Sequence, residues 1–447
     1  MRKSKFGTKE IKILGLSSLG GTLEFYDFII FVFFAEYIAN VFFPKDMGEF
    51  WALLNTYGAF AAGYLARPLG GIVMAHFGDK FGRKNMFMLS ILLMVLPTFV
   101  LAFIPGYETL GFLAPVLLIL IRIFQGIAIG GELPGAWVFV REHCQEKQKA
   151  FFLSCLNSAM ALGILLGSIV FLIINAFFSI EEIATYAWRI AFFVGGIFGI
   201  ISIYLRRFLQ ETPVFKQMKK ESSLSSFPLK DLFKEKDIVK KLFSSMMMTW
   251  VLTGCVIVLV LLMPKFMPSI LNLSGVEGSY LQILGILGIA LGGAFMGYLV
   301  DKFGLFKICI FFSLTFVFFS FLYFYALYEL KNLVLVCILY SIVCFLGGIN
   351  VFAPILMSEV FRAKIRFSGI SFSYNIAYAI SGGITPQLVF WLNTLASKNE
   401  NPFLYGMSIY MIFLALLAIC AVFIVKNLSI KKISKPTKRR GKTYDVF

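Results

Sequence analysis

The sequence predicts an all-α polytopic membrane protein, with twelve transmembrane helices arranged as two bundles of six. Two observations lead to this fold class. The 447-residue chain is 59% hydrophobic and only 15% charged, whereas soluble domains carry about 25% charged residues. Its apolar residues also fall into twelve runs of about 20 residues or more, the length that a helix needs to cross the hydrocarbon core.

The predicted spans, in chain order, cover residues 15–43, 50–77, 85–104, 111–140, 150–177, 187–208, 241–267, 278–299, 306–328, 332–358, 367–394 and 403–426. A polar stretch between the sixth and seventh spans divides the chain. The predicted organisation is therefore an N-terminal tail, a first bundle, a linker, a second bundle and a basic C-terminal tail, at residues 1–14, 15–208, 209–240, 241–426 and 427–447.

The distribution of lysine and arginine predicts the orientation of the chain. Of the 41 such residues, 34 lie in the two tails and in the loops that follow even-numbered spans. Positive charge marks the cytoplasmic side, so we expect both termini in the cytoplasm of a cell with a bacterial-type inner membrane. The net charge of +17 then reflects topology. A nucleic-acid partner would need a soluble basic domain, which the sequence does not indicate.

The two halves of the chain repeat each other. GDKFGRK (78–84) follows the second span, and VDKFGLF (300–306) follows the eighth. REHCQEKQKA (141–150) follows the fourth span, and SEVFRAKIRF (358–367) follows the tenth. Because the two matches have nearly the same offset, we infer a duplicated six-helix unit. Repeats of this kind place a solute site between the halves, near the bilayer midplane.

Several motifs resemble those of the major facilitator superfamily over essentially the whole chain. GDKFGRK is similar to the loop signature of that superfamily, and RIFQG (122–126) to its Arg-x-x-Gln-Gly motif. Further stretches resemble the metabolite:proton symporters, which include proline/betaine, shikimate, α-ketoglutarate and citrate carriers. These stretches are LEFYDF (23–28), RPLGG (67–71), GGELPGA (130–136), RRFLQETPVF (206–215) and SEVFRAKIRFSGISFSYNIAY (358–378).

The sequence departs from the superfamily pattern in three places. Ala75 stands where the loop signature usually opens with glycine, and Leu305 and Phe306 replace basic residues in its second copy. The second departure predicts a cytoplasmic closure that is unequal between the halves. LGILLGS (162–168) lacks the Gly-Pro pair of the drug:proton antiporters that it resembles, which argues against drug export.

Five charged residues lie deep in predicted spans of the first half: Glu24, Asp27, Arg67, Arg122 and Glu132. A charge at that depth costs a few kcal/mol and usually marks a functional site. Glu24 and Asp27 share one helix face, and burial opposes ionisation while a nearby arginine favours it. We therefore expect a proton-coupling and solute site here. The structural alternative is ion pairs that only lock helices together, which we favour for Arg67. For Glu132, a role in stabilising the cytoplasmic gate is as plausible as a role in binding.

Four uncharged residues complete the predicted site: Gln125, Tyr374, Asn375 and Tyr378. Gln125 could bind solute or another helix. Tyr374 and Tyr378 share a face and could form an aromatic wall for a quaternary ammonium, although we favour ordinary packing for them. The deep charged residues lie in the first half of the chain, and the spans of the second half carry almost no deep charge. We therefore expect proton coupling in the first half and much of the neutral solute-binding surface in the second.

A second group of residues is predicted to gate the carrier at its cytoplasmic ends. These residues are Asp79, Lys80, Gly82, Arg83, Lys84, Asp301, Glu359 and Arg366. Gly82 permits a tight turn, Asp79 can pair with basic groups or helix ends, and Arg83 and Lys84 are expected near lipid headgroups. Such contacts would favour the state open to the outside. The alternative is a basic turn that only sets topology.

The resemblance and the deep charges together predict a proton-coupled symporter that imports a small organic solute by alternating access. We favour a zwitterion such as proline or a betaine. The alternatives are a mono-, di- or tricarboxylate such as α-ketoglutarate, or a metabolite exporter or exchanger. The sequence contains no phosphate-binding, nucleophile or metal motif, so we expect no enzyme activity and no cofactor beyond the proton gradient. The expected partners are solute, protons and the bilayer, and the expected state is a monomer.

Overall fold

The computed structural model describes residues 8–396 and 406–433, and within them every regular element is helical. The first half folds into α1 (Thr8–Phe33), α2 (Ala35–Phe42), α3 (Glu49–Phe81), α4 (Arg83–Leu101), α5 (Tyr107–Leu110), α6 (Leu113–His143), α7 (Lys149–Phe177), α8 (Ile180–Glu182) and α9 (Trp188–Arg206). The second half folds into α12 (Ile238–Cys255), α13 (Met263–Leu271), α14 (Gly275–Phe303), α15 (Leu305–Tyr325), α16 (Leu333–Leu346), α17 (Phe352–Val360), α18 (Arg366–Ala396) and α19 (Met407–Ile433).

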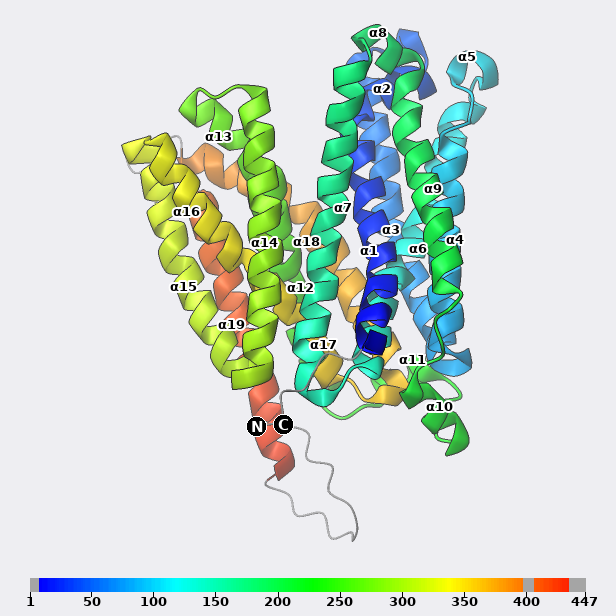
Figure 1. Ribbon diagram of the computed structural model, residues 1–447, viewed down its shortest axis with the longest axis vertical. Coiled ribbons are helices and arrows are strands. Elements are labelled where there is room, and N and C mark those ends of the chain that lie inside the picture. Colours follow the sequence, from blue (N-terminus) through cyan, green and yellow to red (C-terminus); the bar gives the residue numbers. More distant parts are fainter. Residues whose placement is uncertain (1–7, 397–405, 434–447) are drawn as a thin grey trace.

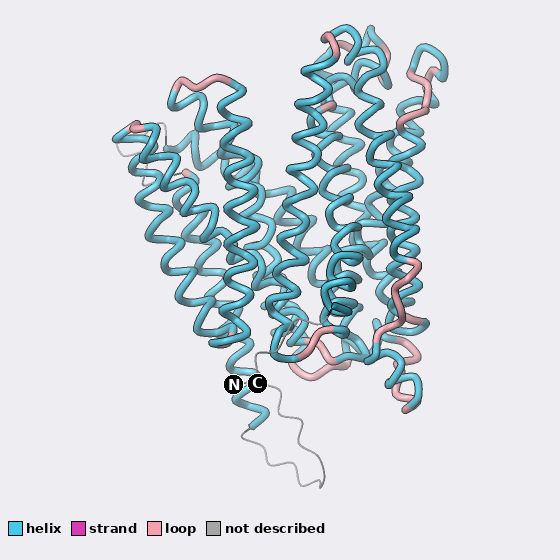
Figure 2. Tube along the Cα trace, viewed as in Figure 1, coloured by secondary structure: helices cyan, strands magenta, loops and turns pink. Residues whose placement is uncertain are grey.

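The helices gather into two bundles that lie side by side, with α7 and α14 at their junction (Figure 1). The loops gather at the two ends of the bundles (Figure 2). The start of α1 and the end of α19 lie at the same end, which we call the predicted cytoplasmic end. The predicted tails lie partly outside the described residues, at 1–7 and 434–447, as does the start of the last predicted span at 403–405.

Each predicted span coincides with one long helix or with helical segments joined end to end. Ten stretches of the described chain are long and apolar enough to cross a membrane. α3 and α18 are also long, at 33 and 31 residues, but less apolar. The polar residues of α18 that cause this include Ser371, Tyr374 and Asn375, which contact α3 or α6 of the other half. These two helices therefore carry polar faces to the middle of the molecule.

Three predicted spans are interrupted, which was not predicted. The span predicted at 15–43 breaks at Phe34, between α1 and α2. A π-helical segment, η4 (Val256–Leu262), joins α12 to α13. A 3-10 segment, η6 (Gly347–Val351), separates α16 from α17. The predicted linker contains two helices: α10 (Pro213–Lys220) contacts α6 of the first half, and α11 (Pro228–Phe233) contacts both α3 of the first half and α18 of the second.

The repeated GDKFG and VDKFG stretches form the same kind of turn. Gly82 ends α3 with φ 132°, and Gly304 ends α14 with φ 87°. Residues with a side chain rarely adopt such positive φ values, so glycine is needed at both places. Each turn reverses the chain within one residue, because α4 begins at Arg83 and α15 at Leu305.

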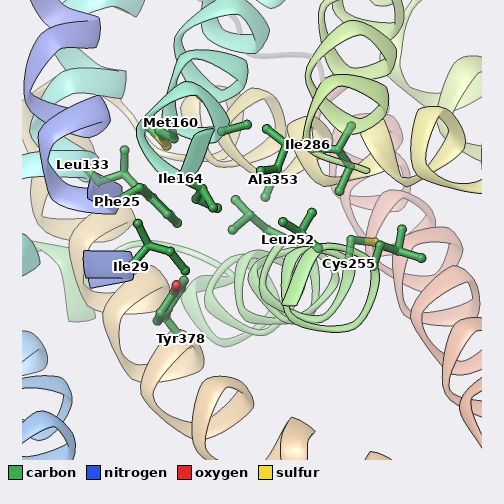
Figure 3. Close-up of a cluster of buried hydrophobic side chains, with 14 of the residues drawn as sticks. Phe25, Ile29, Leu133, Met160, Ile164, Leu252, Cys255, Ile286, Ala353 and Tyr378 are labelled. Atoms are coloured by element: carbon green, nitrogen blue, oxygen red, sulfur yellow. The ribbon is translucent and has the colours of Figure 1, made fainter. Parts of the chain in front are cut away.

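Apolar side chains cover the outside of the bundles and fill the space between them. Leu65, Leu291 and Phe311 are 74%, 65% and 61% exposed, as expected for helix faces that contact lipid. Between the halves, Phe25 of α1, Ile164 of α7 and Leu252 of α12 belong to one buried apolar cluster and line the same small cavity (Figure 3). This packing closes the centre of the molecule.

Candidate functional site

A small cavity lies between α1, α3 and α6 and reaches α18 of the second half. Its volume is about 30 Å³, which leaves room for one or two water molecules. It is lined by Glu24, Phe25, Asp27, Gly63, Tyr64, Arg67, Arg122, Gln125, Gly126, Ile129 and Tyr378. The structure thus brings together six of the nine predicted solute and proton residues, and a larger ligand requires some of these side chains to move.

Close contact between α3 and α6 shapes one wall of this cavity. A Cβ atom on Gly126 would lie 1.9 Å from the carbonyl oxygen of Gly63, a separation that no side chain tolerates. Glycine at 126 therefore lets the two backbones touch. The contact places Arg67 of α3 and Arg122 of α6 where both face carboxylates of α1.

Asp27 is the centre of the more tightly bonded half of the site. Its carboxylate accepts hydrogen bonds from Arg122 Nη1 at 3.1 Å, Thr98 Oγ1 at 2.8 Å and Gln125 Nε2 at 3.1 Å. The Arg122 guanidinium also lies over the ring of Phe31, 3.7 Å from its centroid. Asp27 and Arg122 are both almost fully buried, so their charges compensate each other in a medium of low dielectric constant.

Glu24 has looser partners. Its Oε1 lies 3.4 Å from Arg67 Nη2, and the same nitrogen lies 3.3 Å from the hydroxyl of Tyr374. The Arg67 guanidinium is enclosed by the rings of Tyr64, Tyr374 and Tyr378, at 5.5, 5.6 and 4.2 Å from their centroids. Each of the two acids predicted on one face of α1 therefore has its own arginine.

Several polar atoms around the cavity have no hydrogen-bond partner among the described residues. The donors are Nε of Arg67 and both Nε and Nη2 of Arg122, and the acceptors are Oε2 of Glu24 and Oε1 of Gln125. Buried polar groups are normally satisfied, and exceptions often mark a site for ligand or water. This cavity therefore presents free donors beside Arg122 and a free carboxylate oxygen on Glu24.

Three predicted site residues do not line the cavity. Glu132 bonds to Arg206 Nη2 at 2.6 Å and to Ser90 Oγ at 2.5 Å. Asn375 donates to the carbonyl oxygen of Gly130 at 2.8 Å and so joins α18 to α6. Tyr374 contacts Arg67 from behind the cavity lining. These contacts hold helices together, and the predicted roles of the three residues in solute or proton binding stay predictions.

Three predicted gating residues, Asp79, Arg83 and Arg366, meet at the predicted cytoplasmic end, in a cluster that we call the Asp79 clasp. It consists of Asp79, Arg83, Glu142, Arg366 and Ser368. Arg83 bonds to Asp79 and Glu142, at 2.5 Å each, and donates to the carbonyl oxygen of Ala363 at 2.6 Å. Arg366 pairs with Glu142 at 3.1 Å.

Asp79 also caps a helix of the other half. It accepts hydrogen bonds from the backbone N–H and the hydroxyl of Ser368, both at 2.8 Å, in the first turn of α18. A carboxylate at a helix N-terminus satisfies free N–H groups and the helix dipole. The expectation that Arg83 lies near lipid headgroups is wrong: its side chain is 1% exposed, because these partners draw it inward.

The repeat of this cluster in the second half is the Asp301 clasp, which consists of Asp301, Lys149 and Glu359. Asp301 accepts from the backbone N–H groups of Ala150 and Phe151, at 2.9 and 2.8 Å, in the first turn of α7. Lys149 pairs with Glu359. Glu142 and Glu359 are equivalent in the repeat, and each pairs with the start of a helix in the opposite half.

The remaining predicted gating residues lie around the turn between α3 and α4. Lys80 lies over the ring of Phe81, 5.2 Å from its centroid, and Gly82 forms the turn itself. The backbone N–H of Lys84 donates to Glu211 Oε2 at 3.2 Å. Glu211 of the predicted linker therefore caps the start of α4, a role that the sequence prediction missed.

Other residues of the site were also missed. Tyr64 encloses Arg67, and Thr98 bonds to Asp27. The spacing of Tyr64 and Arg67, three residues apart on α3, would have placed them on one helix face. Glu142 and Lys149 were already visible as repeat-equivalent charges, and this is the signal that could have added them to the gating residues.

Comparisons with known proteins show the family to which the chain is related. The sequence profile of the Major Facilitator Superfamily matches residues 28–386. The "Proline/betaine transporter" of Salmonella typhimurium is 31% identical over 422 residues, which cover 90% of this chain and 81% of that protein. The "Inner membrane metabolite transport protein YhjE" of Escherichia coli is 30% identical over 389 residues, covering 86% and 88%.

A solved structure of the proton:xylose symporter XylE aligns with a TM-score of 0.72 at 16% identity. The alignment covers 94% of this chain and 95% of that chain. At this identity the likeness concerns the fold alone.

Proposed function

The chain belongs to the Major Facilitator Superfamily and is a transporter of the metabolite:proton symporter type, and from this premise we propose that it imports a small zwitterion together with protons. The proposed solute class is that of proline and the betaines, which carry a carboxylate and an ammonium group. The protein is integral to the inner membrane, and we place both termini in the cytoplasm.

One observation carries the choice of solute. The cavity leaves donors free on Arg122 and an acceptor free on Glu24, so it offers complementary partners to a carboxylate and to a cation. A dicarboxylate would find donors, but the free oxygen of Glu24 would repel it. The name of the Salmonella relative, a proline/betaine transporter, supports the same class.

The proposed mechanism assigns the proton to Asp27. When Asp27 is ionised, its carboxylate holds Arg122 Nη1 at 3.1 Å. Protonation removes that charge and weakens the pair, so Arg122 becomes available to the carboxylate of the solute. Proton binding and solute binding would therefore favour each other, which is the requirement for symport.

Contacts at the predicted cytoplasmic end support alternating access. Both clasps join one half to the other there, so that end is closed while they hold. Solute would enter from the opposite side, displace side chains around the cavity and leave after the clasps break.

Uptake into vesicles tests this function. Purified protein is reconstituted, a pH gradient with the interior alkaline is imposed in sodium-free buffer, and labelled proline, glycine betaine, α-ketoglutarate, citrate and shikimate are compared. We expect proline or glycine betaine to accumulate, and a protonophore to abolish the accumulation. Accumulation of a di- or tricarboxylate instead would overturn the solute class. Loss of preloaded solute without any gradient-driven uptake would overturn import.

A further inference from the structure

Arg67 sits in surroundings that would suit a free cation. The rings of Tyr64, Tyr374 and Tyr378, which we call the tyrosine box, surround its guanidinium at 4.2 to 5.6 Å from their centroids. The rings of Tyr64 and Tyr378 stack at 5.9 Å, with 18° between their planes. Cages of aromatic rings bind quaternary ammonium groups by cation–π attraction. In this protein the cage is filled by a side chain of the protein itself.

The carboxylate that such a cation would need is also in place. Glu24 lies beside the guanidinium at 3.4 Å, and its second oxygen has no partner among the described residues. Arg67 and Glu24 are each buried to within a few per cent. A cation in the box would therefore be desolvated, which strengthens its attraction to both the rings and the carboxylate.

Arg67 is held more loosely than the arginines that lock helices together. Its contacts to Tyr374 and Glu24 measure 3.3 and 3.4 Å, and its Nε has no partner among the described residues. Arg83, in contrast, makes three bonds of 2.5 to 2.6 Å. Moving Arg67 out of the box would therefore break weaker interactions than moving Arg83.

The small volume of the cavity gives an independent reason for Arg67 to move when a solute binds. The cavity beside the box holds about 30 Å³, so a trimethylammonium group does not fit while Arg67 stays in place. Gly382 borders the same box: a Cβ atom on it would lie 3.8 to 3.9 Å from Tyr64, Thr253 and Tyr378. The box therefore has no bulky side chain on that edge, and Arg67 is the group that fills it.

We propose that Arg67 is an internal substitute for the cationic group of the solute, which displaces it from the tyrosine box and takes over its partner Glu24. This inference rests on the proposed zwitterionic solute. In the empty carrier Arg67 neutralises Glu24 and keeps the box filled. On binding, the ammonium group replaces the guanidinium between the same rings, and Arg67 leaves the box. Arg67 then competes with the solute, and the affinity that is measured is reduced by that competition.

Removing the competitor tests the proposal, because it predicts a gain of affinity. Glycine betaine binding is measured by calorimetry on the purified full-length protein, in the same buffer for every variant. We expect Arg67→Gln to bind glycine betaine about tenfold more tightly than the wild type, since one competing cation–π and ion-pair contact is lost. Arg67→Lys, which keeps a tethered cation, is the matched comparison and should gain much less affinity than Arg67→Gln.

A ligand of the same shape that lacks the cationic charge separates the effect of that charge from the effect of space. In 3,3-dimethylbutanoate a carbon atom replaces the quaternary nitrogen of glycine betaine. We expect Arg67→Gln to bring no gain in affinity for this ligand, because the ligand has no cation to take the place of the guanidinium. Unchanged or weaker binding of glycine betaine to Arg67→Gln would overturn the proposal, and so would equal tightening of both ligands, which would show that only room was gained.

Two further measurements keep the test decisive. If Arg67→Gln does not fold, Tyr378→Leu should lose the preference for glycine betaine over 3,3-dimethylbutanoate, whereas Tyr378→Phe should keep it; a preference retained in Tyr378→Leu counts against the box. If vesicle uptake shows that the solute is not a zwitterion, tetramethylammonium is the probe. Tighter binding of tetramethylammonium to Arg67→Gln than to wild type would then support a cation site in the tyrosine box. Equal or weaker binding would refute it.

Discussion

Buried arginines occur in two kinds of surroundings in this chain. Arg83 and Arg206 have several short hydrogen bonds to carboxylates and carbonyl oxygens. Arg67 and Arg122 border the cavity and leave N–H groups unused. An unused buried donor costs about 1–3 kcal/mol, so a ligand that satisfies it recovers that free energy. The first pair therefore stabilises the fold, and the second pair is suited to binding.

Asp27→Asn tests the proton-coupling role. The amide keeps the size of the carboxylate but cannot release a proton, so we expect uptake driven by a pH gradient to be abolished while the protein still inserts. Uptake into vesicles and elution as a single species during gel filtration measure the two properties. Exchange of solute without a gradient should persist. Normal gradient-driven accumulation in the variant would remove Asp27 from the coupling step.

Arg122→Lys tests the carboxylate anchor. Lysine keeps the charge but loses the planar fork that holds a carboxylate with two hydrogen bonds. Loss of one charge-assisted pair should cost about 1.5–3 kcal/mol, or roughly a 10- to 150-fold loss of affinity. Calorimetry and thermal melting on the same sample distinguish the roles, because wild-type affinity with a lowered Tm would mean that Arg122 is only structural.

At the scale of single residues, the charged residues of the site could be identified from the sequence, but their partners could not. A carboxylate or guanidinium inside an apolar run is conspicuous, so Glu24, Asp27 and Arg122 could be found directly. Which arginine meets which acid depends on how α3 and α6 pack, and helical spacing within α1 does not contain that information. Tyr64 was missed because tyrosine is frequent here, with 18 in the chain, and one more carries little signal.

At the scale of elements, helix ends do much of the joining between the halves. Asp79 at the end of α3 caps α18, and Asp301 at the end of α14 caps α7. The free N–H groups of a first helical turn exist in any helix, but here their acceptors come from the other half of the molecule. Opening the predicted cytoplasmic end therefore leaves these N–H groups without their caps until water replaces the carboxylates.

Asp79→Ala tests this capping role. The variant loses the bonds to Ser368 and Arg83, so we expect the balance between access states to shift by about 1.5–3 kcal/mol towards the form open at the predicted cytoplasmic end. Transport should slow while solute affinity changes little, since Asp79 is not in the cavity. Calorimetric affinity and vesicle uptake are compared, with Asp301→Ala as the matched variant. If affinity falls as much as transport, the gating role is wrong.

The element scale also shows what hydropathy cannot predict. All twelve predicted spans correspond to helical segments, because apolar length is a strong constraint. The break at Phe34 went unpredicted, since apolar residues continue through it and no proline marks it. The 3-10 segment at Gly347–Val351 was missed although two glycines, Asn350 and the nearby Pro354 signal it. The helices of the predicted linker were missed for another reason: α10 and α11 are short, and α10 depends on contacts with the first half while α11 depends on contacts with both halves.

At the scale of the whole molecule, the duplication in the sequence reappears as exchanged contacts. Glu142 of the first half pairs with Arg366 of the second, and Glu359 of the second pairs with Lys149 of the first. The family comparisons confirm the predicted class of fold, twelve helices in two bundles, and the prediction of a transporter. The residue offsets pointed to these charges, but the sequence did not show that each pair would cross between the halves.

Charge reversal tests whether the Lys149–Glu359 pair holds the halves together. Lys149→Glu and Glu359→Lys each place like charges side by side, so we expect either one to favour the form open at the predicted cytoplasmic end. The double variant restores opposite charges and should restore the closed form. The distance between spin labels on the exposed ends of α7 and α14 measures the change. A double variant as open as the single ones would contradict the pairing.

The unequal strength of the two clasps sets an order of events. Arg83 is buried in the Asp79 clasp, whereas its repeat equivalent in the other clasp is Leu305, and Lys149 and Glu359 are 19% and 23% exposed. Partly exposed ion pairs are weak, so we expect the Asp301 clasp to separate first. The bundles would then begin to move apart where α7 meets α14, before the Asp79 clasp breaks as well. Solute would leave along that seam, on one flank of the molecule and not down its centre.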